Sequence, residues 1–154
     1  MAHIVESQME TPAADLRRRL DRAERQLPAL VSGQVGEYLR SLDQIEQLFD
    51  QLAADAADVR PEMVRWLDLQ ARLGSRAGKL VRLAGAEGGF AALRAANPPA
   101  EGAWWRLDQL VAEERKRSWT RWAVIAVAAA ALLAVLAFVY SRWLAPSPEL
   151  AQVM

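Results

Sequence analysis

The spacing of apolar residues changes along the chain, from narrow stripes in the first hundred residues to one unbroken run near the end. Between residues 11 and 96, apolar side chains recur every three or four positions, which places them on one face of a helix. From Trp122 to Tyr140, nineteen consecutive residues carry no charge. The two patterns predict an all-α protein, in which a small helical bundle is followed by one long C-terminal helix that spans a membrane.

Three helices with heptad seams are expected in the bundle. The first begins at Thr11-Pro12, an N-cap residue followed by proline at the first helical position. Its seam comprises Leu16, Leu20, Ala23, Leu27 and Leu30, and the second seam comprises Val31, Val35, Tyr38, Leu42, Ile45, Phe49, Leu52, Ala56 and Val59. The third, after Pro61, comprises Met63, Trp66, Gln70, Leu73, Ala77, Leu80 and Ala84, and it is widened by Leu67, Leu69, Val81 and Leu83. A helix with so wide an apolar face touches two neighbours, which favours an intramolecular bundle over an intermolecular coiled coil.

Glycine and proline divide the chain. Gly74 and Gly78 each cost about 1 kcal/mol in a helix interior, so a close helix crossing is expected there. Glycines from residue 85 to 89 end the third helix, and Asn97-Pro98-Pro99 ends a short helix after it. The expected organisation is a disordered N-terminus (1–10), a helical bundle (11–96), a Pro/Gly linker (97–102), a juxtamembrane helix (103–121), a transmembrane helix (122–143) and a short extracytoplasmic tail (144–154).

The apolar run has the length of a membrane span. As a helix, the segment from Trp122 to Trp143 measures roughly 31 Å, close to the hydrocarbon thickness of a bilayer. Arg115, Lys116, Arg117 and Arg121 precede the run, whereas only Arg142 follows it closely. This asymmetry predicts a cytoplasmic N-terminus and an extracytoplasmic C-terminus in the cytoplasmic (inner) membrane. The same cationic residues are candidates for contact with lipid headgroups.

Aromatic and small residues in and beside the run suggest how the helix is anchored at the membrane interfaces and how it packs against another helix. Trp119 and Trp122 at one end, with Tyr140 and Trp143 at the other, are expected to lie at the two membrane interfaces. One helical face carries Ala123, Ala126, Ala130, Ala134 and Ala137, and such a face allows close packing with another helix. A second interpretation is that an alanine-rich genome uses alanine in its anchors. An arginine excess over lysine, 17 to 2, is typical of GC-rich bacterial genomes.

An apolar run of this length also occurs in two settings besides a membrane anchor. One is the core helix of a soluble protein, although a chain of this size has little apolar surface with which to enclose it. The second is a signal anchor for an exported domain. The N-terminal sequence has no apolar region after a basic start, so it does not predict a secretory signal.

Charge differs between the bundle helices. Residues 33–58 carry net charge −5, whereas residues 11–31 carry +2 and residues 60–96 carry +4. We expect the acidic middle helix to pair with its two basic neighbours, although the same signs also suit an external protein partner.

Catalytic chemistry is hard to find in this sequence. It has no cysteine, and its one histidine, His3, lies in the terminus that is expected to be disordered. Asp43, Glu46 and Asp50 share a helix face, but without a histidine or a looped ligand geometry a solvated surface is favoured over a cation site. No phosphate-binding glycine loop is present, and zero net charge gives no indication of nucleic-acid binding. We therefore expect no catalytic residue, no cofactor, no metal and no small-molecule substrate.

The remaining hypothesis is a non-enzymatic membrane-anchored adaptor or accessory subunit, in contact with lipid and with a protein partner or a second copy. Trp104 and Trp105 are candidate contacts for the partner, although docking on the bundle and insertion into the lipid interface are the alternatives. The rival hypothesis is a membrane-tethered regulatory module that recruits or senses a cytoplasmic partner transiently.

Overall fold

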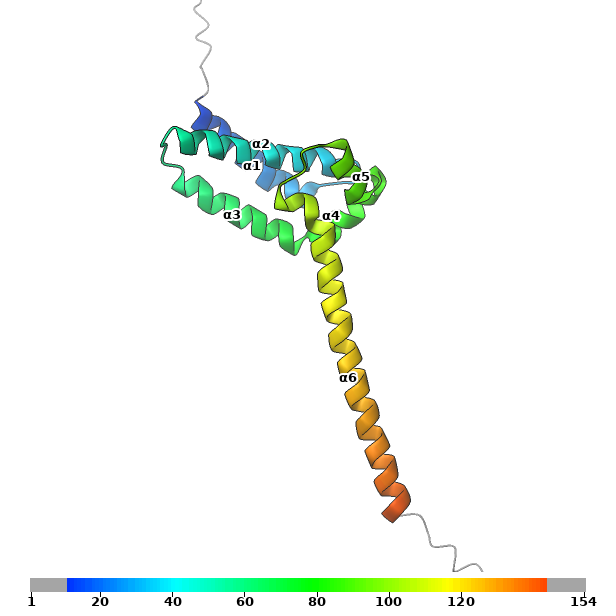
Figure 1. The fold of residues 1–154 in the computed structure, drawn as a ribbon. Coiled ribbons are helices and arrows are strands. Elements are labelled where there is room, and N and C mark those ends of the chain that lie inside the picture. The colour runs from blue at the N-terminus through cyan, green and yellow to red at the C-terminus, as the bar shows by residue number, and fades with distance from the viewer. Residues whose placement is uncertain (1–10, 144–154) are drawn as a thin grey trace, which may run out of the picture. The chain divides into compact units, whose positions relative to one another are not determined.

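The protein is all-α, as the sequence predicts. The structure, a computed structural model, describes residues 11–143, and within that range it contains no strand. The helices are α1 (Pro12–Ala29), α2 (Val35–Ala54), α3 (Arg60–Ser75), α4 (Ala77–Ala84), α5 (Gly89–Ala96) and α6 (Leu107–Trp143), with the 3₁₀ turns η1 (Gly85–Glu87) and η2 (Ala103–Arg106) (Figure 1). Predictions for residues 1–10 and 144–154, among them that for His3, lie outside the described residues.

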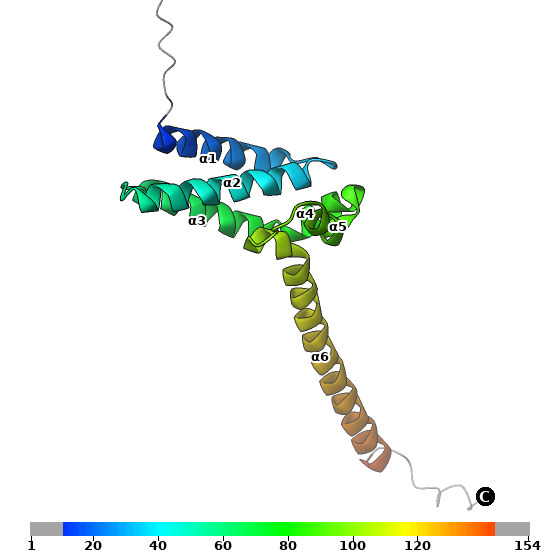
Figure 2. The ribbon, with the colours of Figure 1, turned by 45° about the horizontal axis from the view of Figure 1, so that its top comes forward.

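Two compact units make up the chain, residues 1–111 and residues 112–154. In the first, α1 packs against both α2 and α3, and α4 contacts α2 and α5 (Figure 2). Of the second unit, the structure describes the rest of α6, as far as Trp143. The first unit extends beyond the bundle expected for residues 11–96, because residues 104–107 contribute side chains to the same core.

Local capping explains where the long helices begin and end. The Thr11 side chain accepts a hydrogen bond from the Ala14 amide at 3.3 Å, as an N-cap residue does. At the start of α2 the side chain of Gln34 makes no such bond. Instead the Glu87 carboxylate, which is distant in sequence, accepts from the amides of Val35 (2.9 Å) and Gly36 (3.1 Å). An anion at a helix N-terminus satisfies amides that have no partner within the helix.

The backbone of α2 approaches α5 closely beside this cap. A Cβ built on Gly36 would lie 2.9 Å from Leu93 Cδ2, so the α2 backbone and α5 meet where only glycine fits without movement of Leu93. At the other end of α2, the Ala57 amide donates to the Leu52 carbonyl at 3.0 Å, and Ala56 has φ of +54°. This is the geometry of a Schellman cap with alanine at the position that glycine usually takes.

The core follows the first two predicted seams closely. Leu16, Leu20, Ala23, Leu27 and Leu30 are buried, as are Val35, Tyr38, Leu42, Ile45, Phe49 and Leu52. Val31 and Ala56 are exposed, which contradicts their place in the second seam, because Val31 lies between α1 and α2 and Ala56 lies beyond the end of α2. The Phe49 ring contacts that of Trp66 with the centroids 6.0 Å apart, which joins α2 to α3.

The third seam is partly wrong. Trp66, Leu73, Ala77, Leu80 and Ala84 are buried as expected, but Leu69 and Glu62 are buried where Gln70 and Met63 were expected. Met63 and Leu67 are exposed. The close crossing expected at Gly74 and Gly78 is also wrong, since a Cβ on either glycine would meet nothing within 4 Å.

The ion pairs connect other helices than expected. Arg17 of α1 pairs with Glu62 of α3 at 2.5 Å, and Arg65 of α3 pairs with Asp21 and Glu24 of α1. Within the described residues, no ion pair joins an acidic residue of α2 to α1 or α3; instead, Arg19 donates to the amide oxygen of Gln44. The acidic residues of α2 therefore do not direct its packing through ion pairs with α1 or α3, and apolar burial is the larger contribution.

Candidate functional site

The apolar run of α6 is exposed along its length. This helix is long and apolar enough to cross a membrane, and none of its most apolar stretch is buried within the described structure. The large exposed residues are Val124, Ile125, Val127, Leu132, Leu133, Val135, Leu136, Phe138, Val139 and Tyr140. A core helix of a soluble protein buries such side chains, so the structure gives no support to a soluble core helix here.

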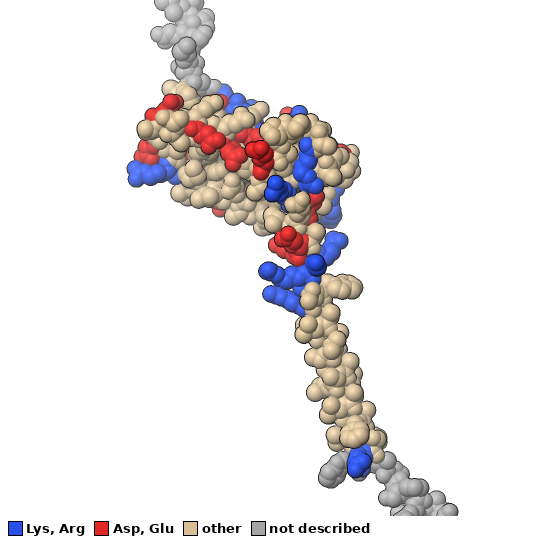
Figure 3. All heavy atoms as spheres, viewed as in Figure 1, with Lys and Arg blue, Asp and Glu red and all other residues tan. Residues whose placement is uncertain are grey.

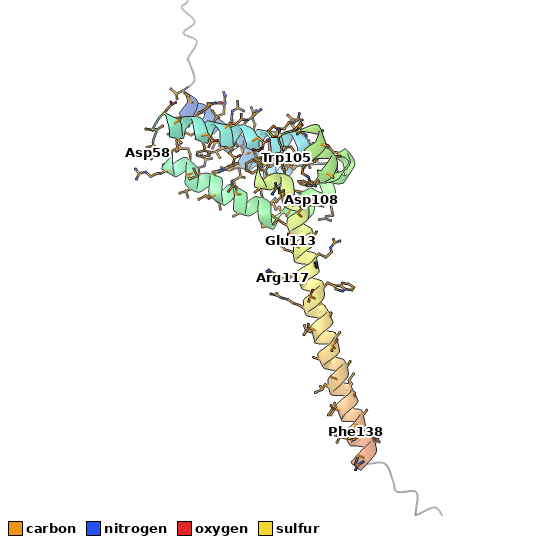
Figure 4. All side chains as sticks on the ribbon, in the orientation of Figure 1. Asp58, Trp105, Asp108, Glu113, Arg117 and Phe138 are labelled. Carbon is orange, nitrogen blue, oxygen red and sulfur yellow. The ribbon has the colours of Figure 1, made fainter. Side chains whose placement is uncertain are left out.

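Basic groups lie at both ends of the run, mostly before it (Figure 3). Arg115, Lys116, Arg117 and Arg121 are all exposed, as is Arg142 after the run. Figure 4 shows the side chains of Arg117 and Phe138 extending from the helix. Arg117, Arg121 and Trp122 also line one shallow hollow on the helix surface. This spacing of cations and an aromatic ring suits a lipid–water interface.

The aromatic and alanine positions singled out in the sequence lie on α6. Trp119, Trp122 and Tyr140 are exposed, so they are available to a membrane interface, whereas the side chain of Trp143 lies outside the described ones. Ala123, Ala126, Ala130, Ala134 and Ala137 lie within α6 and are exposed. Nothing in residues 11–143 covers this alanine face.

Trp104 and Trp105 are buried in the first unit, at 3% and 0% exposure. Both indole N–H groups donate to the carboxylate of one residue, Asp43 of α2, at 2.8 Å from Trp104 and 3.0 Å from Trp105. The ring of Trp104 also meets Trp66 edge-on at 5.4 Å. Docking on the bundle is thereby confirmed as the role of these rings. Their use as a partner contact is corrected, because neither ring leaves surface for a second protein.

An ion pair also holds the same segment. Arg94 of α5 donates to the Trp105 carbonyl at 2.7 Å and to both carboxylate oxygens of Asp108, at 2.7 and 3.1 Å (Trp105 and Asp108 are labelled in Figure 4). A bidentate pair of this kind fixes both partners in direction. Residues 104–108 are thus held by a carboxylate of α2 and a guanidinium of α5. Sequence reasoning missed this arrangement, since no local pattern relates Asp43 to rings about sixty positions later.

Acidic side chains of α2 gather on one face of the domain (Figure 3). Asp43, Glu46, Asp50 and Glu101 line a groove of about 580 Å³ between α2 and residues 96–102. Partial desolvation of the carboxylate and the nearby charges of Asp50, Asp43 and Glu101 raise the pKa of Glu46. Within the described residues, no group of three or more His, Cys, Asp and Glu is arranged to hold a metal ion.

A second groove, of about 600 Å³, lies between α1 and α2. Its lining is polar and includes Arg19, Arg22, Arg40, Gln26 and Gln34. Two of its arginines have partners within the protein, because Arg19 donates to Asp15 and Gln44, and Arg40 donates to the Gly36 carbonyl. Ser41 also lines the groove, and its hydroxyl donates to the Tyr38 carbonyl at 2.6 Å.

Comparison of the chain with models of protein families, with curated proteins and with solved structures yields no match.

Proposed function

We propose that the chain is a non-enzymatic, single-pass membrane protein that acts as an adaptor or a small accessory subunit of a membrane protein complex. The supporting observation is that α6 leaves its whole apolar run exposed, while the first unit encloses its own core. Exposed leucine, valine and phenylalanine on every side of a helix are stable in lipid and costly in water. Membrane flotation tests this proposal. In lysates of cells that express the protein, it should float with the membranes both before and after extraction at alkaline pH. Recovery in the aqueous fraction would overturn the proposal.

The proposed orientation places the first unit in the cytoplasm of the cell and the C-terminus outside the inner membrane. Support comes from the four exposed cations before the run and the one after it. Because the chain has no cysteine, single cysteines report topology cleanly. With a membrane-impermeant maleimide, Ser147→Cys should be labelled in intact spheroplasts, and Ser32→Cys only after lysis. The reverse pattern would invert the orientation.

The alanine face of α6 is proposed to pack against a helix of the partner or of a second copy. Small residues allow two helix backbones to approach closely, and dispersion contacts then replace lipid contacts. Ala130→Leu should reduce recovery of crosslinked partners from intact cells. The matched control is Ala128→Leu, which adds the same volume about half a turn away, on the opposite face. Equal recovery with both variants would remove the alanine face from the proposal.

A transient recruiting or sensing module is the second candidate. It is favoured by the closed core of the first unit and by the polar groove between α1 and α2. The domain for this test extends to Val111, because a fragment that ends at residue 100 would lose Trp104 and Trp105 from the core. A monomer that melts cooperatively without a partner would favour recruitment. Aggregation in the absence of a partner would favour the subunit.

A further inference from the structure

A hollow on the surface of α6 begins among charged residues and ends among apolar ones. It has a volume of about 410 Å³. Its lining residues follow the repeat of a single helix face, and they are Glu114, Arg117, Ser118, Arg121, Trp122 and Ile125. Figure 3 shows basic side chains beside the start of the apolar run, and Arg117 is labelled in Figure 4. One face of α6 therefore changes from cationic to apolar within about two turns.

The two arginines of this hollow have no anionic partner in the described part of the chain. Within residues 11–143, no hydrogen bond or ion pair engages the guanidinium of Arg117 or Arg121. By contrast, Arg65 and Arg94 of the first unit each bind a carboxylate of another helix. Arg117 and Arg121 are one turn apart and about 40° apart around the helix axis, so one anion can reach both guanidinium groups.

The other end of the hollow is apolar and exposed. Trp122 and Ile125 are 69% and 57% exposed, and both belong to the uncharged run. Ile125 lies roughly 12 Å along the helix axis from Arg117. A phospholipid has the same order of polarity over such a distance, because its phosphate lies in the headgroup layer just outside the hydrocarbon. A soluble anion would match the arginines but leave Trp122 and Ile125 uncovered.

We propose that this hollow binds an anionic phospholipid, with the phosphate between Arg117 and Arg121 and an acyl chain along Trp122 and Ile125. The site depends on α6 being in a membrane, so it rests on the proposed function. A lipid with net negative charge is favoured over a zwitterionic one, whose own ammonium group already lies beside its phosphate. The Ser118 hydroxyl donates to the same phosphate.

Glu114 limits the charge that this hollow accepts. Among the lining residues, it is the one farthest from the apolar run. Its carboxylate disfavours further negative charge at that end of the hollow. The site therefore suits one phosphodiester, which carries a single negative charge, beside the two arginines.

Arg115 and Lys116 distinguish this site from a general attraction of cations to an anionic surface. Both are exposed, and neither lines the hollow. Each lies at least about 100° around the helix axis from Arg117 and Arg121. The surface potential of a membrane acts on all four cations, whereas the proposed site acts through only two of them.

Quenching of Trp122 by brominated lipid tests the site in the full-length protein. Trp119→Phe and Trp143→Phe leave Trp122 as the only tryptophan of α6. This protein is reconstituted in about three parts phosphatidylcholine to one part phosphatidylglycerol, with bromine on the acyl chains of one lipid or the other. Corrected for abundance, quenching by phosphatidylglycerol should exceed quenching by phosphatidylcholine at least about threefold. A ratio near one would overturn the proposal.

Two double variants that lose the same charge are then compared in this protein. Arg117→Gln with Arg121→Gln should lower the quenching ratio to about one, whereas Arg115→Gln with Lys116→Gln should keep it above about twofold. Circular dichroism verifies that both variants keep their helix content. An equal fall of the ratio in both would indicate diffuse attraction and overturn the assigned site.

Inorganic phosphate distinguishes a lipid headgroup from a soluble anion. Compared with chloride at equal ionic strength, phosphate should leave the quenching ratio unchanged, because only a lipid also contacts Trp122 and Ile125. A fall of the ratio toward one would assign the arginines to a soluble anion and overturn the proposal.

Flotation of the same liposomes separates this inference from the proposed function. Protein that floats but gives a quenching ratio near one would refute the lipid site and leave the anchoring intact. Protein that does not float would refute the anchoring, and the lipid site with it.

Discussion

Leu39 and Leu133 carry the same side chain in helices of opposite character. Leu39 of α2 is 0% exposed in the core of the first unit, whereas Leu133 is 66% exposed on α6. In the first unit, water is excluded by stripes of apolar residues that interlock between helices. In α6 the apolar residues surround the helix, and nothing in residues 11–143 covers them. One unit is therefore stabilised by its own packing, whereas the exposed run of the other suits the external apolar phase that we propose for it.

The largest effects should come from placing arginine in each region. Leu39→Arg buries an unpaired charge and should cost more than about 4 kcal/mol of folding free energy, so that the first unit no longer melts cooperatively. Leu132→Arg combined with Leu133→Arg should leave that melting unchanged but disfavour membrane insertion by about 5–7 kcal/mol.

Circular dichroism and membrane flotation, measured on both proteins, check this pair of expectations. If the double variant of α6 unfolded the first unit, the two regions would not be independent.

Removing the shared acceptor of the two indoles should have the next largest effect. Asp43→Ala leaves the N–H groups of Trp104 and Trp105 buried without a partner, and this should lower the free energy of unfolding by about 2–5 kcal/mol. Asp43→Asn keeps one acceptor oxygen, so it should lower the free energy of unfolding by less. Asp50→Ala, an exposed position of the same helix, is the control. Urea denaturation measures all three, and similar losses in Asp43→Ala and Asp50→Ala would contradict the assigned role.

Two glutamates should respond to pH with opposite signs. The Arg17 guanidinium lowers the pKa of Glu62 below its ordinary 4.5, so the stability contributed by ionised Glu62 is present above pH 4.5 and is lost as pH falls through the lowered value. Desolvation and neighbouring carboxylates raise the pKa of Glu46, so its ionised form disfavours folding at neutral pH.

At pH 7 we therefore expect Glu62→Gln to destabilise the first unit by about 1–3 kcal/mol and Glu46→Gln to stabilise it by about 0.5 kcal/mol or less. Both differences should shrink as the pH is lowered toward 4, which urea midpoints at a series of pH values would show. The same sign for the two variants would contradict the electrostatic assignment.

The smallest effect is a gain in stability confined to the first unit. Ala56 has a left-handed backbone at the end of α2, a conformation that costs alanine roughly 1 kcal/mol and glycine almost nothing. Ala56→Gly should raise the free energy of unfolding by up to about 1 kcal/mol, measured by urea denaturation, and leave membrane flotation unchanged. Ala54→Gly, at the last helical residue of α2, should do the opposite.

The sequence predicted the fold class and most of the core, because heptad spacing reports directly which side of a helix is buried. It predicted Leu42, Ile45 and Trp66 correctly on this ground. It failed on α3, where apolar residues lie on more than one face of the helix and spacing alone does not say which face is buried. Leu67 and Leu69 were both expected to widen the buried face, but only Leu69 is buried, and Leu67 is exposed.

Long-range polar contacts were beyond prediction from the pattern. The Glu87 cap of α2 and the bonds of Asp43 to two indoles join residues more than fifty positions apart, and neither has a local signal. On α6 the alanine, aromatic and basic positions follow from the sequence, and their exposure is what a lipid-facing helix requires. Their partners do not follow, because one helix face carries no information about which second helix it meets.

The distribution of indole rings has a spectroscopic consequence. Among the described tryptophans, Trp66, Trp104 and Trp105 form one enclosed group, while Trp119 and Trp122 are open to their surroundings. Native fluorescence thus contains two populations that different quenchers reach separately. Acrylamide in the aqueous phase should spare the enclosed group until the protein unfolds, whereas brominated acyl chains should dim only the rings that touch a bilayer.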